Sequence, residues 1–589
     1  MTLPSGLRAN FDGHLANPCG LLAPYCVGGA VLTNAPGSTR TFNGLVLANQ
    51  IFDDFQDFSG SVFEGPVDAR GARFNAGFSF DRAVFKDRVR FEGAIVRPQK
   101  GNSARFHGAR FEDVARFNRA LLYLAVFQDA VFDKFAEFRW ARFYGSAQFG
   151  AVKFGEASSF ADTVFQGPGN FNGASFARQV DFRKARFRNR GSHARFAKAK
   201  FLAPALFDEA QFGGHAEFNE AKFYGGASFA KSVFGFAVNN NGEDEDELAD
   251  PDRNEATDAD LRIAFQGSEF RDGPTGEVAV FDEARFGDLN FRRHANFDDT
   301  KFTRTTPANP SHLPRAHFKE LKCNGGLSMR HAHFGGVIEV DFAGSRFEDD
   351  VDISEAQFGK DAIFEKCQFK QSLSVAGTRF YGYPDFRNVS FKHYPNLFEC
   401  SLPTRLASYR RRERPLIAAR IGTLRRIAAR TDDEKTELRL LVHELKLKGG
   451  FASKLYGIVS NYGQSWLRPA LWLLFFALVV FPVLQLTVNG RLPSTSDQLQ
   501  WLVNSERSTC AAGEGNIFAA AVEISVKNAM IVGSENETRS KRVLECLGAI
   551  VPPGHRTVSG TLLEALQAVL SVVFAFFIGA AVRRRLQLR

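Results

Sequence analysis

Phenylalanine recurs through most of this chain in steps that alternate between five and six residues. Residues 143 to 176, FYGSAQFGAVKFGEASSFADTVFQGPGNFNGASF, hold seven phenylalanines separated by six such steps. The whole chain has 62 phenylalanines against 4 tryptophans and 10 tyrosines, so the pattern selects one aromatic side chain. The same spacing extends from Phe74 to Phe234 and returns from Phe281 and from Phe342. A fixed period of this kind indicates a repeat architecture.

Two backbone conformations could carry an eleven-residue double step. A supercoiled helix is one of them. On a helix, however, five residues turn by about 140°, so the phenylalanines would form two separate rows. The residue two places before each phenylalanine is small, as at Ala136 and Ala141, and the residue between is polar, as at Glu137 and Arg142. Alternation of inward and outward side chains is typical of extended backbone. The pattern therefore predicts very short strands.

These A-x-F units resemble the repeats of the pentapeptide-repeat family, in which a central Leu or Phe follows an Ala two places earlier. The resemblance covers roughly residues 42 to 400. It implies a β-solenoid, a right-handed quadrilateral parallel β-helix, with about 22 residues in a turn and about 12 to 14 turns. The alternation of five with six residues departs from the commonest form of the family. Stacked phenylalanines would fill the axis and leave no lumen.

Some proteins of this family mimic DNA and bind gyrase, which requires an acidic rod. Residues 71 to 235 contain about 26 Lys and Arg against about 15 Asp and Glu. We therefore expect no gyrase binding and expect attraction to anionic lipid, nucleic acid or an acidic partner. The whole chain is also basic, with a formal net charge of +9.

The segments around the repeats differ from them in composition. Residues 1–45 lack the repeat and are predicted to cap the solenoid, which would span residues 46–402. The acidic, apolar-poor stretch 239–260, NNNGEDEDELADPDRNEATDAD, is typical of a solvated loop insertion. Its acids lack the order of a calcium-binding loop, and we expect no metal and no cofactor. No secretory segment is expected at the amino terminus.

Residues 403–460 are predicted to form a basic, amphipathic helical linker. Ile417, Ile421 and Leu424 form one helical stripe, with arginines opposite. Thr431 to Glu434 fits a capping box that opens a second helix, which ends at Gly449 and Gly450. This helical pair would close the other end of the solenoid. Its arginines could bind nucleic acid, but an adjoining membrane segment favours a collar that faces anionic lipid.

The predicted basic collar combines linker arginines with a cluster at the carboxyl terminus. Arg420 and Arg430 belong to the same linker run. The collar residues are Arg410, Arg411, Arg412, Arg414, Arg425, Arg426, Arg583, Arg584 and Arg585.

Residues 461–589 are predicted to form a two-span membrane domain. The spans are 466–488 and 562–582, joined by an external loop, 489–561. Basic clusters before the first span and after the second place both termini in the cytoplasm, as in a multi-pass protein of the cell inner membrane. A buried hairpin in a soluble protein is the alternative. The stretches SNYGQSWLRPALWLL and FFIGAAVRRRLQLR resemble the carboxyl-terminal hairpins of bacterial membrane-bound pentapeptide-repeat proteins, which implies membrane location.

Catalysis is not expected, because the sequence has no phosphate-binding loop and no nucleophile motif. One functional hypothesis is a scaffold: the solenoid engages an unknown protein partner and the hairpin anchors it. The alternative is an oligomeric two-span pore that resembles an ion channel only in architecture, because MIVGSE stands where the potassium filter TVGYG would lie. In that hypothesis residues 516–537 contain a re-entrant helix, and an external surface helix is the alternative for this stretch.

Specific residues are predicted for the external loop and, separately, for the pore hypothesis. Cys510 and Cys546 are the only cysteines of the external loop and could form a disulfide. The candidate pore residues are Glu523, Asn528, Gly533 and Glu564.

Overall fold

The computed structural model divides the chain into two compact units. The first contains residues 1–409 and 419–437, and the second contains residues 410–418 and 438–589. The structure describes residues 40–97, 99, 101–188, 193–234, 263–272, 277–286, 295–303, 314–404, 406, 409–463, 465–488, 517–529, 550–551, 555–556 and 558–587. Most of the predicted amino-terminal cap, the acidic stretch 239–260, Gly533, Cys510 and Cys546 lie outside these residues.

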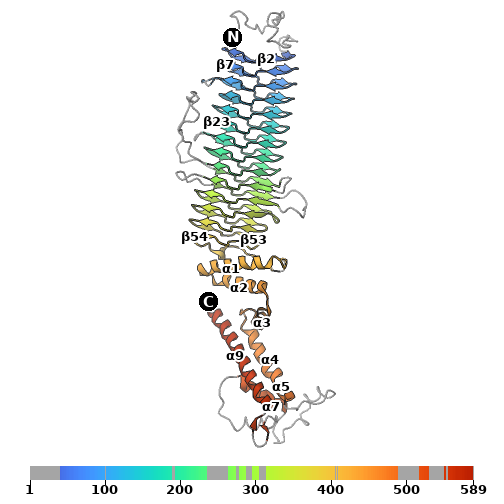
Figure 1. Ribbon diagram of the computed structural model, residues 1–589, viewed down its shortest axis with the longest axis vertical. Helices are drawn as coiled ribbons and strands as arrows, with labels where there is room; N and C mark the ends of the chain where they lie inside the picture. Colours follow the sequence, from blue (N-terminus) through green and yellow to red (C-terminus); the bar gives the residue numbers. More distant parts are fainter. Residues whose placement is uncertain are drawn as a thin grey trace, which may run out of the picture. The chain divides into compact units, whose positions relative to one another are not determined.

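The first unit is a parallel β-solenoid of about 13 turns, which confirms the predicted fold class. Strands β1 to β54, from Thr41–Phe42 to Ser390–Phe391, contain two to four residues each. Each strand pairs with the fourth strand along the chain, except that β51 pairs with β54, and the strands form four parallel sheets of 13 or 14 strands. Figure 1 shows these strands stacked turn upon turn. One turn consists of β9 (Val84–Phe85), β10 (Val89–Arg90), β11 (Ile95–Val96) and β12 (Ser103–Arg105).

The corners explain why the steps alternate between five and six residues. In a five-residue step such as Phe80 to Phe85, the Ala83 N–H donates to the Phe80 carbonyl oxygen at 3.0 Å. Arg82 between them has φ of 58°, the left-handed conformation that the third residue of a type II turn requires. The six-residue step from Phe85 to Phe91 crosses its corner, Lys86 to Arg88, without a left-handed residue. Tight and wide corners therefore alternate around each turn.

The phenylalanine rings form long stacks along the solenoid axis, interrupted where another residue takes the inward position, as at Leu122 and Cys323. The Phe160 ring lies parallel to the rings of Phe138 and Phe182, with both centroid separations at 4.7 Å. Phe149 and Phe171 meet the same ring edge-on at 5.3 Å. All five side chains are fully buried. The interior is a packed aromatic core, as the sequence predicts.

Several buried hydroxyl groups at the small inward positions are satisfied within the solenoid, whereas Ser61 Oγ and Ser158 Oγ have no partner among the described residues. The Thr163 hydroxyl donates to the Phe138 carbonyl oxygen of the preceding turn at 2.6 Å, and the Ser232 hydroxyl donates to Phe207 in the same way. Each bond removes the cost of an unpaired buried polar group. Serine and threonine can therefore replace alanine at these positions.

Three helices follow the solenoid in sequence: α1 (Arg414–Arg430), α2 (Glu434–Lys448) and α3 (Phe451–Ser460). The predicted capping box at Thr431 is wrong. Asp433 precedes α2 directly, and its Oδ1 accepts the Thr436 N–H at 3.0 Å. The Thr431 hydroxyl instead donates back to the Ile427 and Ala428 carbonyl oxygens, at the end of α1. A capping side chain must lie next to the first helical residue, and Thr431 lies two residues before that position.

The second unit contains two helical segments that are long and apolar enough to cross a membrane, Leu467–Val488 and Thr561–Arg583. The first consists of α4 (Leu467–Phe475), the π-helical segment η3 (Phe476–Val480) and α5 (Phe481–Val488). The π-helical segment ends two residues before Pro482. Proline lacks a backbone N–H and its ring crowds the preceding turn, which accounts for the wider helix at this place. The second lies within α9 (Val558–Gln587), and α7 (Ile517–Ala529) packs against both segments.

The stacked core predicts opposite outcomes for substitutions at adjacent positions. Phe160→Asp places a charge between stacked rings, and we expect it to lower the free energy of unfolding by at least about 4 kcal/mol. Ser159 lies on the outward side in register with Glu137 and Asp181, although its small side chain is covered. Ser159→Lys adds a charge between two carboxylates and should cost less than about 1 kcal/mol. Denaturant unfolding measures both, and equal losses would contradict this assignment of inward and outward residues.

Candidate functional site

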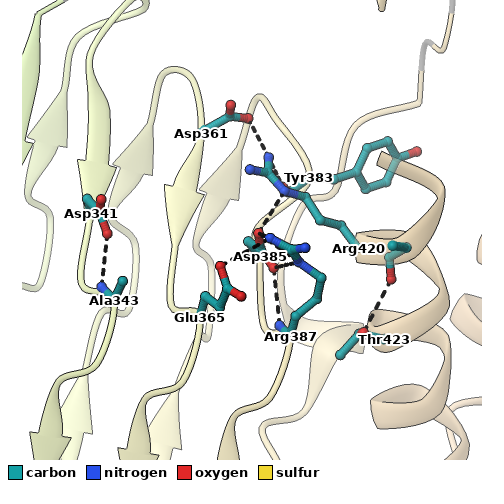
Figure 2. Close-up of polar contacts among 10 residues, drawn as sticks. Asp341, Ala343, Asp361, Glu365, Tyr383, Asp385, Arg387, Arg420 and Thr423 are labelled. Atoms are coloured by element: carbon teal, nitrogen blue, oxygen red, sulfur yellow. Dashed lines mark hydrogen bonds and ion pairs between the residues drawn. The ribbon is translucent and has the colours of Figure 1, made fainter. Parts of the chain in front are cut away.

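A group of buried and half-buried charges joins α1 to the last turns of the solenoid. We call it the Arg420 cluster: Arg420, Asp385, Asp361, Arg387 and Glu365. Figure 2 shows Arg420 reaching from α1 to carboxylates of the solenoid. The Arg420 Nη1 donates to Asp361 Oδ1 at 2.8 Å, and its Nε donates to Asp385 Oδ2 at 3.1 Å. The side chains of Arg420 and Asp385 are 4% and 1% exposed, so this is an interior ion pair.

Arg387 completes the cluster from the side of the solenoid. Its Nε and Nη2 donate to the two carboxylate oxygens of Asp385 at 2.8 and 2.7 Å, and its Nη2 also lies 3.2 Å from Glu365 Oε2. Burial acts to raise the pKa of Asp385, but the hydrogen bonds from Arg387 and the charge of Arg420 outweigh it, so the pKa lies below its ordinary value. Asp385 is therefore an anion held between two guanidinium groups.

The local sequence explains why these charges meet. Asp385 precedes Phe386, whose ring ends a core stack 4.9 Å from Phe364, so Asp385 occupies the outward position of the final repeat. Arg420 lies on the same face of α1 as Ile421 and Leu424, which are fully buried. Arg420 therefore fastens the helix to the end of the solenoid while its apolar neighbours cover that end.

This placement corrects the prediction for Arg420, which does not face lipid or nucleic acid. The spacing in the sequence indicates that Arg420 is buried. Arg420 lies three residues after Ile417 and four before Leu424, which places it on the apolar stripe of the helix. Arg430 is exposed, and its guanidinium carbon lies 4.8 Å from the centroid of the Tyr394 ring.

The collar residues that the structure describes are mostly exposed. Arg425 is half-buried, and the side chains of Arg584 and Arg585 lie outside the described part. The exposed collar arginines are Arg410, Arg411, Arg412, Arg414, Arg426 and Arg583. Their exposure leaves their charge available to an anionic surface.

In the second unit, α7 contacts α5, η3 and α9. The Gln567 Nε2 of α9 donates to the Ser525 carbonyl oxygen of α7 at 2.6 Å, and both residues are fully or almost fully buried. Gln485 of α5 is also buried at 5% exposure. Within the described residues, Gln485 Oε1, Ser525 Oγ and Gln567 Oε1 are enclosed and have no hydrogen-bond partner. Sequence reasoning missed these residues, although Gln485 and Gln567 are polar residues within the two apolar segments.

The predicted pore residues occupy different environments. Glu523 is exposed on α7, Glu564 is half-buried on α9, and Asn528 is half-buried with an enclosed Nδ2 that has no partner among the described residues. Gly533 and the predicted disulfide, Cys510 with Cys546, lie outside the described part of the chain.

The remaining candidates for chemistry are sparse in the described part of the chain. There, no group of three or more His, Cys, Asp or Glu side chains could hold a metal ion. Cys323, Cys367 and Cys400 are buried free thiols. Burial raises the pKa of Cys367 to about 12 and raises that of Cys323 as well, so both thiols are protonated at neutral pH.

Comparison with protein-family models, with curated proteins and with solved structures finds no match to this chain.

The Arg420 cluster predicts unequal effects for two arginines of the same helix. Arg420→Met removes one partner of a buried anion, and we expect it to lower the free energy of unfolding by about 3 kcal/mol. Arg426→Met is the control, because Arg426 is exposed and its guanidinium donates only to the neighbouring Thr423 hydroxyl at 3.2 Å among the bonds described. It should change stability by less than about 0.5 kcal/mol. Denaturant unfolding of the full chain checks both, and an equally silent Arg420→Met would contradict the role of the cluster.

Proposed function

We propose that this chain is a membrane-tethered pentapeptide-repeat protein whose solenoid serves as an interaction scaffold. The observation that carries the proposal is the filled interior of the solenoid, because a core of stacked phenylalanines leaves the outer surface as the part that can bind. No catalytic role is proposed for the described residues.

The membrane tether is supported by the exposure of the two apolar segments. Leu471 on the first is 55% exposed and Phe576 on the second is 69% exposed. The core helix of a soluble protein would bury such side chains. Exposed arginines before the first segment and after the second favour cytoplasmic termini and a place in the bacterial inner membrane.

One exposed aromatic residue marks a candidate contact on the solenoid. Trp140 is 45% exposed and has φ of 56°, a left-handed conformation that is uncommon for a bulky residue. The guanidinium carbons of Arg139 and Arg119 lie 4.7 and 5.5 Å from its ring centroid. Tryptophan and arginine dominate the energetic centres of protein interfaces. We therefore place the partner's contact at Trp140, and the arginines favour an acidic partner.

The scaffold proposal is tested in membranes that contain the full chain. A photo-crosslinking amino acid in place of Trp140 should produce one discrete adduct with a partner protein. That adduct should stay in membranes washed with alkaline carbonate, because the two apolar segments hold it there. The same substitution at Lys184 is the control, since Lys184 is exposed at an equivalent corner two turns away. Equal labelling from both positions, or extraction of the chain by carbonate, would contradict the proposal.

A second candidate function is an oligomeric ion-conducting pore. The observation in its favour is the packing of α7 against both apolar segments, with the Gln567 to Ser525 hydrogen bond between them. With 13 residues, α7 is about 20 Å long, too short to cross a bilayer core of about 30 Å. A short helix that packs against two membrane spans has the arrangement expected of a re-entrant pore helix. Two spans cannot enclose a wet pathway alone, so a pore requires several copies around an axis.

Reconstitution separates the pore from the scaffold. If the chain forms a pore, purified protein should be a closed ring by native mass spectrometry and should pass cations in planar bilayers. Glu523→Lys and Glu564→Lys should each reduce cation selectivity, because they reverse charge near the mouth. Glu156→Lys makes the same charge change at an exposed corner of the solenoid and should have no effect. Monomeric protein without current would leave only the scaffold.

A further inference from the structure

A cavity of about 210 Å³ opens on the solenoid surface beside β10 (Val89–Arg90) and β14 (Ala115–Arg116). Besides these strands, wide six-residue corners of two successive turns contribute to it. Its lining residues are Arg88, Val89, Arg90, Asp113, Val114 and Arg116. Three guanidinium groups therefore share the cavity with one carboxylate.

The arrangement of two of these arginines is unfavourable by itself. Arg90 and Arg116 lie directly in register on adjacent parallel strands. Adjacent strands are about 4.8 Å apart, and like charges directly opposite one another destabilise a sheet. Arg88, at the corner before β10, adds a third positive charge to the same cavity.

The carboxylates on either side of this pair already have partners, and for Glu137 that partner is Arg116 itself. Asp68, in register with Arg90 on the preceding turn, accepts hydrogen bonds from Arg70 Nε at 2.9 Å and Nη2 at 2.7 Å. Glu137 Oε2, on the turn after Arg116, lies 3.2 Å from Arg116 Nε and accepts the Asn118 Nδ2 at 2.7 Å. The Arg90 Nε is enclosed and has no hydrogen-bond partner among the described residues.

The one carboxylate that lines the cavity is also partly occupied. Asp113 Oδ1 accepts the N–H of Val114, the next residue, at 2.7 Å. Arg88 Nε also lies 3.7 Å from Asp87 Oδ1, and Arg116 is paired with Glu137. Arg90 is therefore the arginine of the cavity with an enclosed donor that lacks a partner among the described residues.

We propose that this cavity binds the phosphate group of a small anionic ligand. Guanidinium groups donate pairs of parallel hydrogen bonds that match phosphate oxygens, and a dianion relieves the repulsion between Arg90 and Arg116. The cavity is several times larger than the roughly 30 Å³ that a water molecule occupies in the liquid, so it admits a phosphate with room for its substituent. The site requires neither a protein partner of the solenoid nor the membrane segments.

Calorimetric titration of the full chain in uncharged detergent micelles tests the site. The probes are inorganic phosphate and pyrophosphate, at an ionic strength held constant with sodium chloride to separate specific binding from screening. We expect saturable binding of one anion per chain. Arg90→Met should weaken it by about tenfold, because it removes charged hydrogen-bond donors. Arg186→Met removes the same charge from an exposed position outside the cavity and should leave the affinity unchanged.

A second variant tests the sign of the charge in the cavity. Asp113→Asn keeps an oxygen for the Val114 N–H and removes the only carboxylate of the lining, so it should tighten binding several-fold. A merely structural role for these residues would not tighten anion binding. This variant also keeps the proposal testable if Arg90→Met fails to fold.

The source of the phosphate is distinguished by a parallel titration with a short-chain phosphatidic acid in the same micelles. Tighter Arg90-dependent binding of the lipid would identify a headgroup, and tighter binding of pyrophosphate would identify a soluble ligand. Absence of saturable binding, or equal weakening by Arg90→Met and Arg186→Met, would overturn the proposal.

Discussion

Face-to-face stacking of phenylalanine rings sets the geometry on which the solenoid depends. The rings of Phe171 and Phe196 lie 4.8 Å apart with an angle of 2° between their planes. This spacing equals the distance between hydrogen-bonded strands, so side-chain stacking and backbone pairing repeat with the same period. Each ring also meets rings of neighbouring stacks edge-on, the arrangement that aromatic quadrupoles favour. A larger or branched side chain could not satisfy both contacts.

The stacks also explain why the solenoid accommodates an insertion. The acidic stretch 239–260 separates β35 (Val233–Phe234) from β36 (Ile263–Ala264) in the sequence. β36 nevertheless pairs with β32 (His215–Glu217), and the Phe218 and Phe265 rings stack at 4.8 Å. Only the positions that supply inward rings must keep their places. The residues between two turns are therefore free to vary in number.

The tight corners have an energetic cost that the stacks offset. Arg82, Trp140 and Lys184 adopt the left-handed conformation that glycine or asparagine would take at less cost. Each such residue costs on the order of 1 kcal/mol. Burial of one phenylalanine contributes roughly 1.5 to 3 kcal/mol, so the core can impose this conformation on residues with other side chains. The corner positions can then carry charges, as Lys184 does beside Glu209 at 3.9 Å.

Features with a sequence period were predictable, and features that join distant residues were not. The inward phenylalanines and the two apolar segments follow from local patterns, and the structure confirms them. Arg420 meets Asp385, 35 residues earlier, and Asp361, 59 residues earlier, and neither spacing is a repeat of the solenoid. Gln567 meets Ser525 across 42 residues. Such contacts depend on how elements pack, and the sequence marks them only as polar residues on apolar faces.

The end of the solenoid shows why a buried ion pair can be useful where an apolar contact would also be stable. A well-packed apolar replacement for a buried ion pair is often as stable, so Arg420 and Asp385 are poor evidence for stability alone. An apolar face, however, can slide or turn over the end of a uniform stack. Arg420 must meet Asp361 and Asp385 together, and only one position of α1 allows both contacts. The cluster therefore specifies where the part of α1 that contains Arg420 lies on the end of the solenoid.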